Sequence, residues 1–185
     1  MMGNKIMVAF KTVFLLGWNL VRIALGRLFH PGRFRVDWLQ RISPLCSVGV
    51  FERGVLRIGR NCDFAPYCDL EVHGKGQLEI GAGCYFNRGC MVSAQESVTI
   101  GEHCLFGPDV MVFDNHHRHS PGTGVSPDLV TAPVSIGSHS WLGAGVIVLK
   151  GVRIGRNCVI GAGCVVRNDV PDGSVLVCRQ EQVLK

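Results

Sequence analysis

Residues 136–166 have the sequence IGSHSW-LGAGVI-VLKGVR-IGRNCV-IGAGCV-V. Counted from Ile136, every sixth residue is a large apolar one. Five Ile-Gly pairs open blocks of this kind, and the positions six and twelve residues after each Ile are also apolar; the pairs begin at Ile58, Ile80, Ile100, Ile136 and Ile154. An α-helix, with 3.6 residues per turn, does not keep a period of six on one face. A chain that coils in triangular turns of three short strands does. The repeat predicts an all-β fold, a parallel β-helix.

The length and charge of the chain limit the classes of protein to which it can belong. Its 185 residues suffice for one domain with a sizeable core. The net charge is +5, and no basic run is interleaved with aromatic residues. Nucleic acid is therefore not an expected partner.

Nine cysteines raise the question of disulfides, redox chemistry or a metal site. Their register answers it, because seven of them occupy the fifth position of a hexapeptide: Cys62, Cys68, Cys84, Cys90, Cys104, Cys158 and Cys164. Ser140, Val110 and Val146 stand in that position elsewhere, so it requires a small and fairly apolar side chain. No Cys-x-x-Cys is present. We therefore expect free thiols in the core, no metal, and a reducing compartment, the cytoplasm.

Residues 5–29 have a different pattern, that of an amphipathic helix with one uniformly apolar half. The longest uncharged run is too short to span a membrane, and no signal peptide is expected. Two interpretations follow: the helix packs on the β-helix or on a neighbouring subunit, or it lies at the inner face of a membrane with Lys11, Arg22 and Arg27 toward anionic lipid. Pro31-Gly32 ends the helix. The predicted organisation is a helix and lead-in segment over 1–44, a β-helix over 45–178 and a tail over 179–185.

One interval in the repeat is twice as long as a coil of three hexapeptides. It separates Ile100 from Ile136, and its second half, residues 118–135, is rich in Pro and Gly and lacks the apolar pattern. We expect a loop there, and long loops in compact repeats often carry function. At its root stand Asp114, Asn115, His116 and His117, followed by His119.

A second irregularity lies one coil earlier. The residue after the apolar opener of each second hexapeptide is small, as in Ala65, Gly107, Gly143 and Gly161, but here it is Asn87. A turn role explains an Asn as well as a ligand contact does. Its position one coil away from the histidines favours contact with a polar ligand.

Over residues 45–178 the sequence resembles the hexapeptide-repeat acyltransferases, which form a left-handed β-helix. The resemblance is nearest to O-acetyltransferases that act on galactosides and maltose or in capsular and exopolysaccharide assembly. It is carried by residues 80–87 (IGAGCYFN), 110–117 (VMVFDNHH), 133–144 (PVSIGSHSWLGA) and 160–169 (IGAGCVVRND).

The resemblance assigns roles to individual residues. His117 is the general base, selected over His116 and His119 by its register. Asn87, Trp141 and Asp114 bind the acceptor, and Asp114 either orients or polarises a histidine or serves the turn. The acyl donor, acetyl-CoA, is bound by Gly143, Ala144, Ala162 and Arg167. Val177–Val183 departs from the usual family ending, and Gln95 replaces a carboxylate that galactoside-type relatives have near the acceptor.

We therefore expect a cytoplasmic, acetyl-CoA-dependent O-acetyltransferase acting on a sugar or glycan hydroxyl, with His117 as base. The resemblance also implies a homotrimer with active sites between subunits. Three alternatives stay open. They are an N-acyltransferase on an amino sugar nucleotide, a zinc enzyme like the γ-carbonic anhydrases using His103, His117 and His139, and a β-helix scaffold without catalysis.

Overall fold

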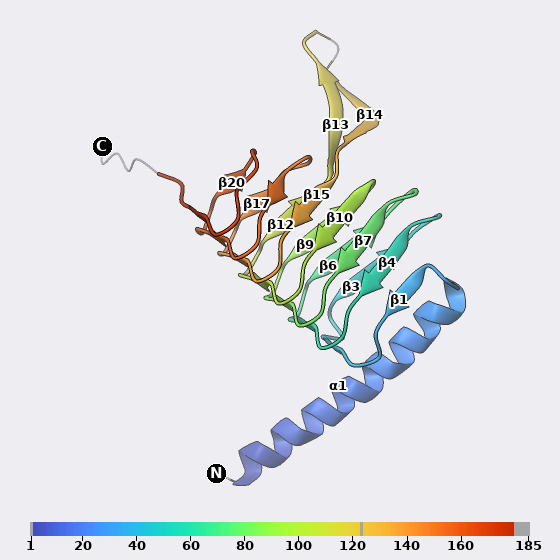
Figure 1. The fold of residues 1–185 in the computed structure, drawn as a ribbon. Coiled ribbons are helices and arrows are strands. Elements are labelled where there is room, and N and C mark those ends of the chain that lie inside the picture. The colour runs from blue at the N-terminus through green and yellow to red at the C-terminus, as the bar shows by residue number, and fades with distance from the viewer. Residues whose placement is uncertain (1, 123, 180–185) are drawn as a thin grey trace.

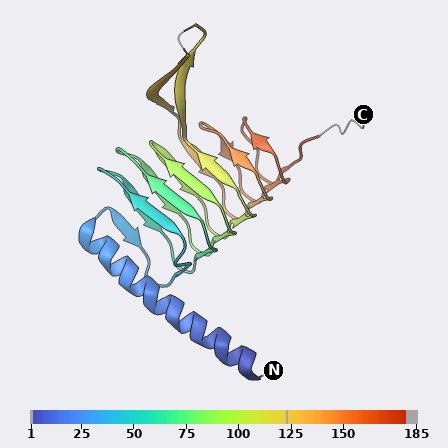
Figure 2. The same ribbon diagram turned by 180° about the vertical axis from the view of Figure 1, so that it is seen from behind.

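The chain forms a three-sided coil of short parallel strands, with one long helix across its N-terminal end (Figures 1 and 2). This computed structural model describes residues 2–122 and 124–179, and only the backbone of residues 2–11. The helix is α1 (Met2–Phe29). Each side of the coil is one parallel sheet. Sheet A contains β1 (Phe34–Val36), β4 (Val55–Ile58), β7 (Gln77–Ile80), β10 (Ser97–Ile100), β15 (Val134–Ile136) and β18 (Arg153–Ile154).

The other two sides follow the same order along the chain. Sheet B contains β2 (Arg41–Ile42), β5 (Asp63–Phe64), β8 (Tyr85–Phe86), β11 (Leu105–Phe106), β16 (Trp141–Leu142), β19 (Val159–Ile160) and β21 (Val175–Leu176). Sheet C contains β3 (Ser47–Val50), β6 (Asp69–Val72), β9 (Met91–Ala94), β12 (Met111–Phe113), β17 (Ile147–Val148) and β20 (Val165–Val166). We name the three edges of the coil A–B, B–C and C–A after the sheets that meet there.

Each residue of the coil lies beside the equivalent residue of the next turn. β7 and β10 pair Ile80 with Ile100, and β8 and β11 pair Phe86 with Phe106. The apolar openers of the hexapeptides therefore form columns inside the coil. In one column Phe64, Phe86 and Phe106 stack with ring centroids 4.7 and 4.2 Å apart. The predicted left-handed parallel β-helix is confirmed.

The cysteines form two further columns in the core, as predicted, and they also donate hydrogen bonds. The Sγ atom of Cys84 lies 3.1 Å from the carbonyl oxygen of Gly101 in the next coil, and Cys104 makes the same contact with Gly137 at 3.2 Å. Ser140 stands in this column and donates to the carbonyl of Gly155 at 2.9 Å. The position thus selects a small donor that satisfies a buried carbonyl group.

The coil begins earlier than the predicted boundary at residue 45, which is wrong. β1 pairs with β4 and β2 with β5, so residues 34–50 form a complete first coil. Its apolar openers are Val36, Ile42 and Val48, six residues apart. The prediction missed this coil because it opens with Val36-Asp37 instead of Ile-Gly. At the other end, residues 180–185 of the predicted tail lie outside the described residues.

The inserted segment is a β-hairpin where a loop was predicted over 118–135. β13 (Asn115–Ser120) pairs antiparallel with β14 (Gly124–Thr131), and the hairpin projects from the C–A edge (Figure 1). Residues 134 and 135 already belong to β15. The prediction that an inserted segment interrupts the coil here is therefore confirmed. The predicted loop conformation and the predicted end at residue 135 are wrong.

α1 caps the open N-terminal end of the coil. In later coils the carbonyls of Ile58, Phe64 and Cys68 accept N–H groups from the coil before. The equivalent carbonyls of the first coil have no such partner, and α1 supplies one for each side of the coil. Arg27 donates to Val36 at 2.7 Å, Asn19 to Ile42 at 3.1 Å and Arg22 to Cys46 at 2.7 Å.

This capping reverses the predicted orientation of the helix. The face that packs on the coil is centred on Asn19 and Ile23, both fully buried, and Arg22 and Arg27 point into the coil instead of toward lipid. The side chain of Lys11 lies outside the described part.

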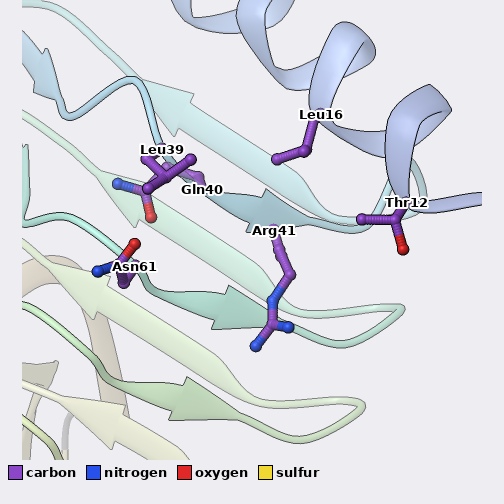
Figure 3. A pocket seen from close by; sticks show the side chains of 6 residues that line it. All are labelled: Thr12, Leu16, Leu39, Gln40, Arg41 and Asn61. Carbon is purple, nitrogen blue, oxygen red and sulfur yellow. The ribbon is translucent and has the colours of Figure 1, made fainter. Parts of the chain in front are cut away.

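Beside the contact between α1 and the coil, Thr12, Leu16 and Arg41 line a crevice of about 360 Å³ (Figure 3). Thr12–Phe29 is also long and apolar enough to cross a membrane by length and composition, unlike the predicted short run.

Candidate active site

Asp114 anchors the root of the hairpin. Its side chain is fully buried, and its two carboxylate oxygens accept the backbone N–H groups of Gln95, Glu96 and Ser97 at distances from 2.7 to 3.0 Å. The Nδ2 group of Asn115 donates to the same carboxylate at 3.0 Å. Hydrogen bonds to an ionised acceptor are strong. The predicted contact of Asp114 with the acceptor is wrong, because the carboxylate is buried and occupied by these donors. Of the other two roles, the structure shows the turn role, in which Asp114 ties the hairpin to the turn before β10.

The three histidines of β13 are sorted onto its two faces by a β-bulge. The pairing register of the hairpin shifts between His117 and His119. The rings of His116 and His119 lie 5.8 Å apart, so these two share a face. Because side chains alternate along a strand, His117 lies on the opposite face from His116. The predicted base is thus set apart from its two neighbours.

The hydrogen bonds of these rings also differ. Nδ1 of His116 lies 2.8 Å from the carbonyl oxygen of His117, and since a carbonyl only accepts, this nitrogen is the donor. The exposed ring of His117 makes no hydrogen bond to any other residue that the structure describes. Both of its ring nitrogens are therefore available to a ligand or to a second chain.

A row of turns along the B–C edge contains two free backbone donors. The first turn residue of successive coils is Pro66, Arg88, Pro108, Ala144 and Ala162. Proline has no N–H group, and the N–H of Arg88 donates to Oδ1 of Asn87 at 2.8 Å. The N–H groups of Ala144 and Ala162 make no hydrogen bond within the described parts of the chain, and both residues are exposed. We call these two N–H groups the corner amides.

Gly143 and its neighbours explain how the coils meet at this edge. A Cβ atom on Gly143 would lie 2.7 Å from the nitrogen of Ala162, and one on Gly107 would lie 2.6 Å from that of Ala144. At these two positions glycine is therefore required, because a side chain would meet the backbone of the next coil. Since adjacent strands are about 4.8 Å apart, the corner amides suit two carbonyl oxygens of one extended ligand.

Asn87 and Trp141 lie close to this edge. Asn87 stands directly before the turn, with its Oδ1 engaged by Arg88 and its Nδ2 group unbonded among the described residues. Trp141 lies on the outer face of sheet B, between Leu105 and Val159, and half of its surface is exposed. Asn87, Trp141 and the corner amides are thus brought to one side of the molecule.

Arg167 and His117 lie on the other side of sheet C. Arg167 follows β20 and is exposed at the C–A edge, two coils beyond the hairpin root. Within one chain, sheet C therefore separates the predicted base from the corner amides.

The zinc alternative finds no support in the geometry of a single chain. His103 and His139 stack at the A–B edge with ring centroids 5.2 Å apart, whereas His117 is on the hairpin at the C–A edge. Among the described residues, no three His, Cys, Asp or Glu side chains are arranged to hold a metal ion.

Residues 133–168 match the family model of the bacterial transferase hexapeptide (six repeats). The galactoside O-acetyltransferase of Lactococcus lactis subsp. lactis (strain IL1403) is 46% identical over 78 residues, which are 42% of this chain and 38% of that one. The putative lipopolysaccharide biosynthesis O-acetyl transferase WbbJ of Escherichia coli (strain K12) is 35% identical over 103 residues, 51% and 53% of the two chains. The matches thus span about half or less of these relatives.

Solved structures agree with the fold. A hexapeptide-repeat acetyltransferase from Vibrio cholerae O1 biovar eltor, complexed with acetyl coenzyme A, aligns with a TM-score of 0.58 at 25% identity, over 64% of this chain and 63% of that one. A mutant of GDP-perosamine N-acetyl transferase from Caulobacter crescentus, in complex with CoA and GDP-perosamine, aligns with a TM-score of 0.54 at 25% identity, over 85% and 60%. In its repeat, in its coil and in these relatives, the chain is thus similar to the hexapeptide-repeat acetyltransferases.

Proposed function

We propose that the protein is an acetyl-CoA-dependent O-acetyltransferase that acts on the hydroxyl of a sugar or glycan in the cytoplasm. The observation that carries the proposal is the pair of corner amides, free and exposed where most coils have a proline or a capped N–H. The names of the two curated relatives, a galactoside and a lipopolysaccharide O-acetyltransferase, support the acceptor class. The core of free thiols supports a reducing compartment.

The chain's own residues divide the chemistry between them. Acetyl-CoA, when bound, supplies an acyl thioester. His117 accepts the proton of the sugar hydroxyl as its oxygen bonds to the thioester carbon, and returns that proton to the departing sulfur. The N–H of Ala144 donates to the thioester oxygen as it gains negative charge, and the N–H of Ala162 holds the pantetheine arm. Gly143 permits this spacing, and Arg167 attracts the anionic end of the donor.

The acceptor is held on the same side as the corner amides. Trp141 offers an apolar surface to a sugar ring, and the free Nδ2 group of Asn87 donates to a sugar oxygen. Because sheet C separates His117 from these groups in one chain, we propose that the active protein is a homotrimer. Each site then combines His117 of one copy with the corner amides of the next.

Two variants test the assignment of roles. His117→Ala is expected to lower kcat about 100- to 10,000-fold while the fold survives. Ala144→Pro removes one N–H, and Pro66 and Pro108 in the same turn position show that the backbone accepts proline there. It is expected to lower kcat about 100- to 1,000-fold. Ala144→Val, of similar bulk, keeps the N–H and is the control. Thiol release from acetyl-CoA over a panel of sugars measures all three. Turnover by His117→Ala near that of the wild type refutes the base.

Mixing the two inactive variants tests the shared site. If His117 and Ala144 act from different copies, trimers reassembled from equal amounts of both variants regain about a quarter of the wild-type sites. If both residues act within one chain, no mixture regains activity.

The main alternative is acyl transfer to an amine. The N-acetyltransferase aligned above is named as a complex with an amino sugar nucleotide, and its alignment covers 85% of this chain. An amino sugar nucleotide therefore belongs in the acceptor panel. Transfer to it, with none to hydroxyl sugars, would favour the alternative.

A further inference from the structure

We infer that α1 is an in-plane membrane anchor, which holds the base of the β-helix against an anionic lipid surface. The inference starts from the outward half of the helix. Over residues 12–29, the surface of α1 that faces away from the coil is apolar. The exposed large side chains there are Val13, Phe14, Trp18, Leu20, Val21, Leu25, Leu28 and Phe29.

The inward half explains why this arrangement is fixed. Asn19, Arg22 and Arg27 are hydrogen-bonded to the first coil, so the polar side of α1 is committed to the protein. The helix cannot turn its apolar half inward without breaking all three contacts. For the same reason it does not cross a bilayer while docked, and lies parallel to the membrane surface.

The first coil extends this apolar surface beyond the helix. At the A–B edge, Trp38 and Leu39 are half exposed, and the ring of Trp38 lies 4.2 Å from the guanidinium carbon of Arg27. The equivalent positions of the next coil are Arg60 and Asn61. Only at the capped end, among the described coils, does this edge carry a large apolar pair. Tryptophan is favoured at the boundary between lipid and water.

The distribution of charge identifies the occupant as lipid. Residues 1–60 contain ten Lys and Arg against two Asp and Glu, whereas residues 61–185 contain nine against twelve. The end of the molecule that carries α1 is therefore strongly basic, and the remainder is slightly acidic. Arg35, Arg53 and Arg60 are exposed around the base. Arg41 is exposed beside the crevice under α1, where it pairs with Asp63 at 2.9 Å (Figure 3). An apolar helix face ringed by cations matches an anionic bilayer.

The position of α1 argues against a neighbouring copy as the occupant. The helix lies across the end of the coil, and its N-terminal part extends past the coil (Figures 1 and 2). Its apolar half faces away from the coil, along the coil axis. Copies packed side by side, as the proposed active site requires, would leave that direction open.

Vesicle sedimentation of the full-length chain tests the inference. The probes are vesicles of phosphatidylcholine alone and of phosphatidylcholine with about 30% phosphatidylglycerol. We expect the wild type to bind the anionic vesicles, more weakly in high salt. Val21→Gln/Leu25→Gln/Leu28→Gln is expected to lower the partition coefficient at least about tenfold. The control, Val125→Gln/Val175→Gln/Val177→Gln, changes three residues far from α1 that are 66–73% exposed and is expected to bind like the wild type.

Further results distinguish the other occupants. The helix variant is expected to keep the circular dichroism spectrum of the wild type, so that a loss of binding is due to the changed surface and not to unfolding. Wild type that stays in the supernatant, or a helix variant that binds as well as wild type, overturns the inference. So does a helix variant that lowers the mass of the lipid-free protein in light scattering without changing vesicle binding, because the face would then join copies of the chain. None of these readouts depends on acetyl transfer.

Discussion

Replacing Asp114 with Asn changes one buried oxygen at the hairpin root into an NH2 group of the same size. In its less costly orientation the amide keeps an oxygen in the place of Oδ2, which accepts from Glu96, Ser97 and Gln95. Three bonds then lose their ionised acceptor, which lowers the contribution of each from about 1.5–3 to about 0.5–1.5 kcal/mol. The bond from Asn115 is lost as well, because the new NH2 group takes the place of its acceptor. The expected loss of stability is at least about 3 kcal/mol, or at least about 6 °C in Tm for a chain of this length.

Thermal unfolding followed by circular dichroism measures this loss. Asp128→Asn makes the same chemical change at an exposed position on the same hairpin and is expected to leave Tm within about 2 °C of the wild type. If Asp114→Asn unfolds within the same margin, the carboxylate does not hold the hairpin to the coil. The proposed anchoring of the hairpin by Asp114 would then be wrong.

Two further predictions concern the core and the cap. Of the nine cysteines only Cys178 is exposed, and the pKa of Cys46 is raised by its hydrogen bond with Cys68 and by burial. A chromogenic disulfide reagent is therefore expected to modify one thiol quickly in the native protein and all nine in denaturant; a second fast thiol would contradict the buried columns. Arg22→Met leaves the carbonyl of Cys46 without its donor and is expected to cost about 2 kcal/mol, or about 4–8 °C in Tm. The exposed Arg60→Met is its control, and equal Tm values for both would exclude a capping role for Arg22.

The coil itself was readable from the sequence because each hexapeptide carries its own signal. Ile80, Phe86 and Val92 are spaced by six, and the structure buries all three. The first coil escaped because Val36-Asp37 lacks the glycine, although Val36, Ile42 and Val48 keep the spacing. The β-strands of the hairpin were not predicted because Pro127 and the nearby glycines favour turns. A two-stranded hairpin in solvent has free edges, where a strand proline is tolerated.

The site was readable only in part, because its polar contacts join residues far apart in the sequence. The role of Asp114 depends on Gln95–Ser97, one coil away, and no local pattern links them. The sequence does indicate the corner amides: Pro66 and Pro108, which have no N–H group, share a register with Ala144 and Ala162, which have one. Ser140 likewise indicated that a donor is favoured in its own column, which also holds Cys84 and Cys104. The orientation of α1 followed from carbonyl groups, which the sequence does not display.

The three capped carbonyls also bear on how the molecule avoids fibre formation. A parallel β-helix has an open row of backbone acceptors at one end, and a second molecule could extend each sheet by continuing the stack. Repeated addition of that kind would have no natural stop, because every added chain would present a fresh end. Arg27, Asn19 and Arg22 engage one acceptor on each of the three sides, so α1 closes all three growth fronts at once. Loss of this one helix would turn a discrete particle into a subunit of a filament.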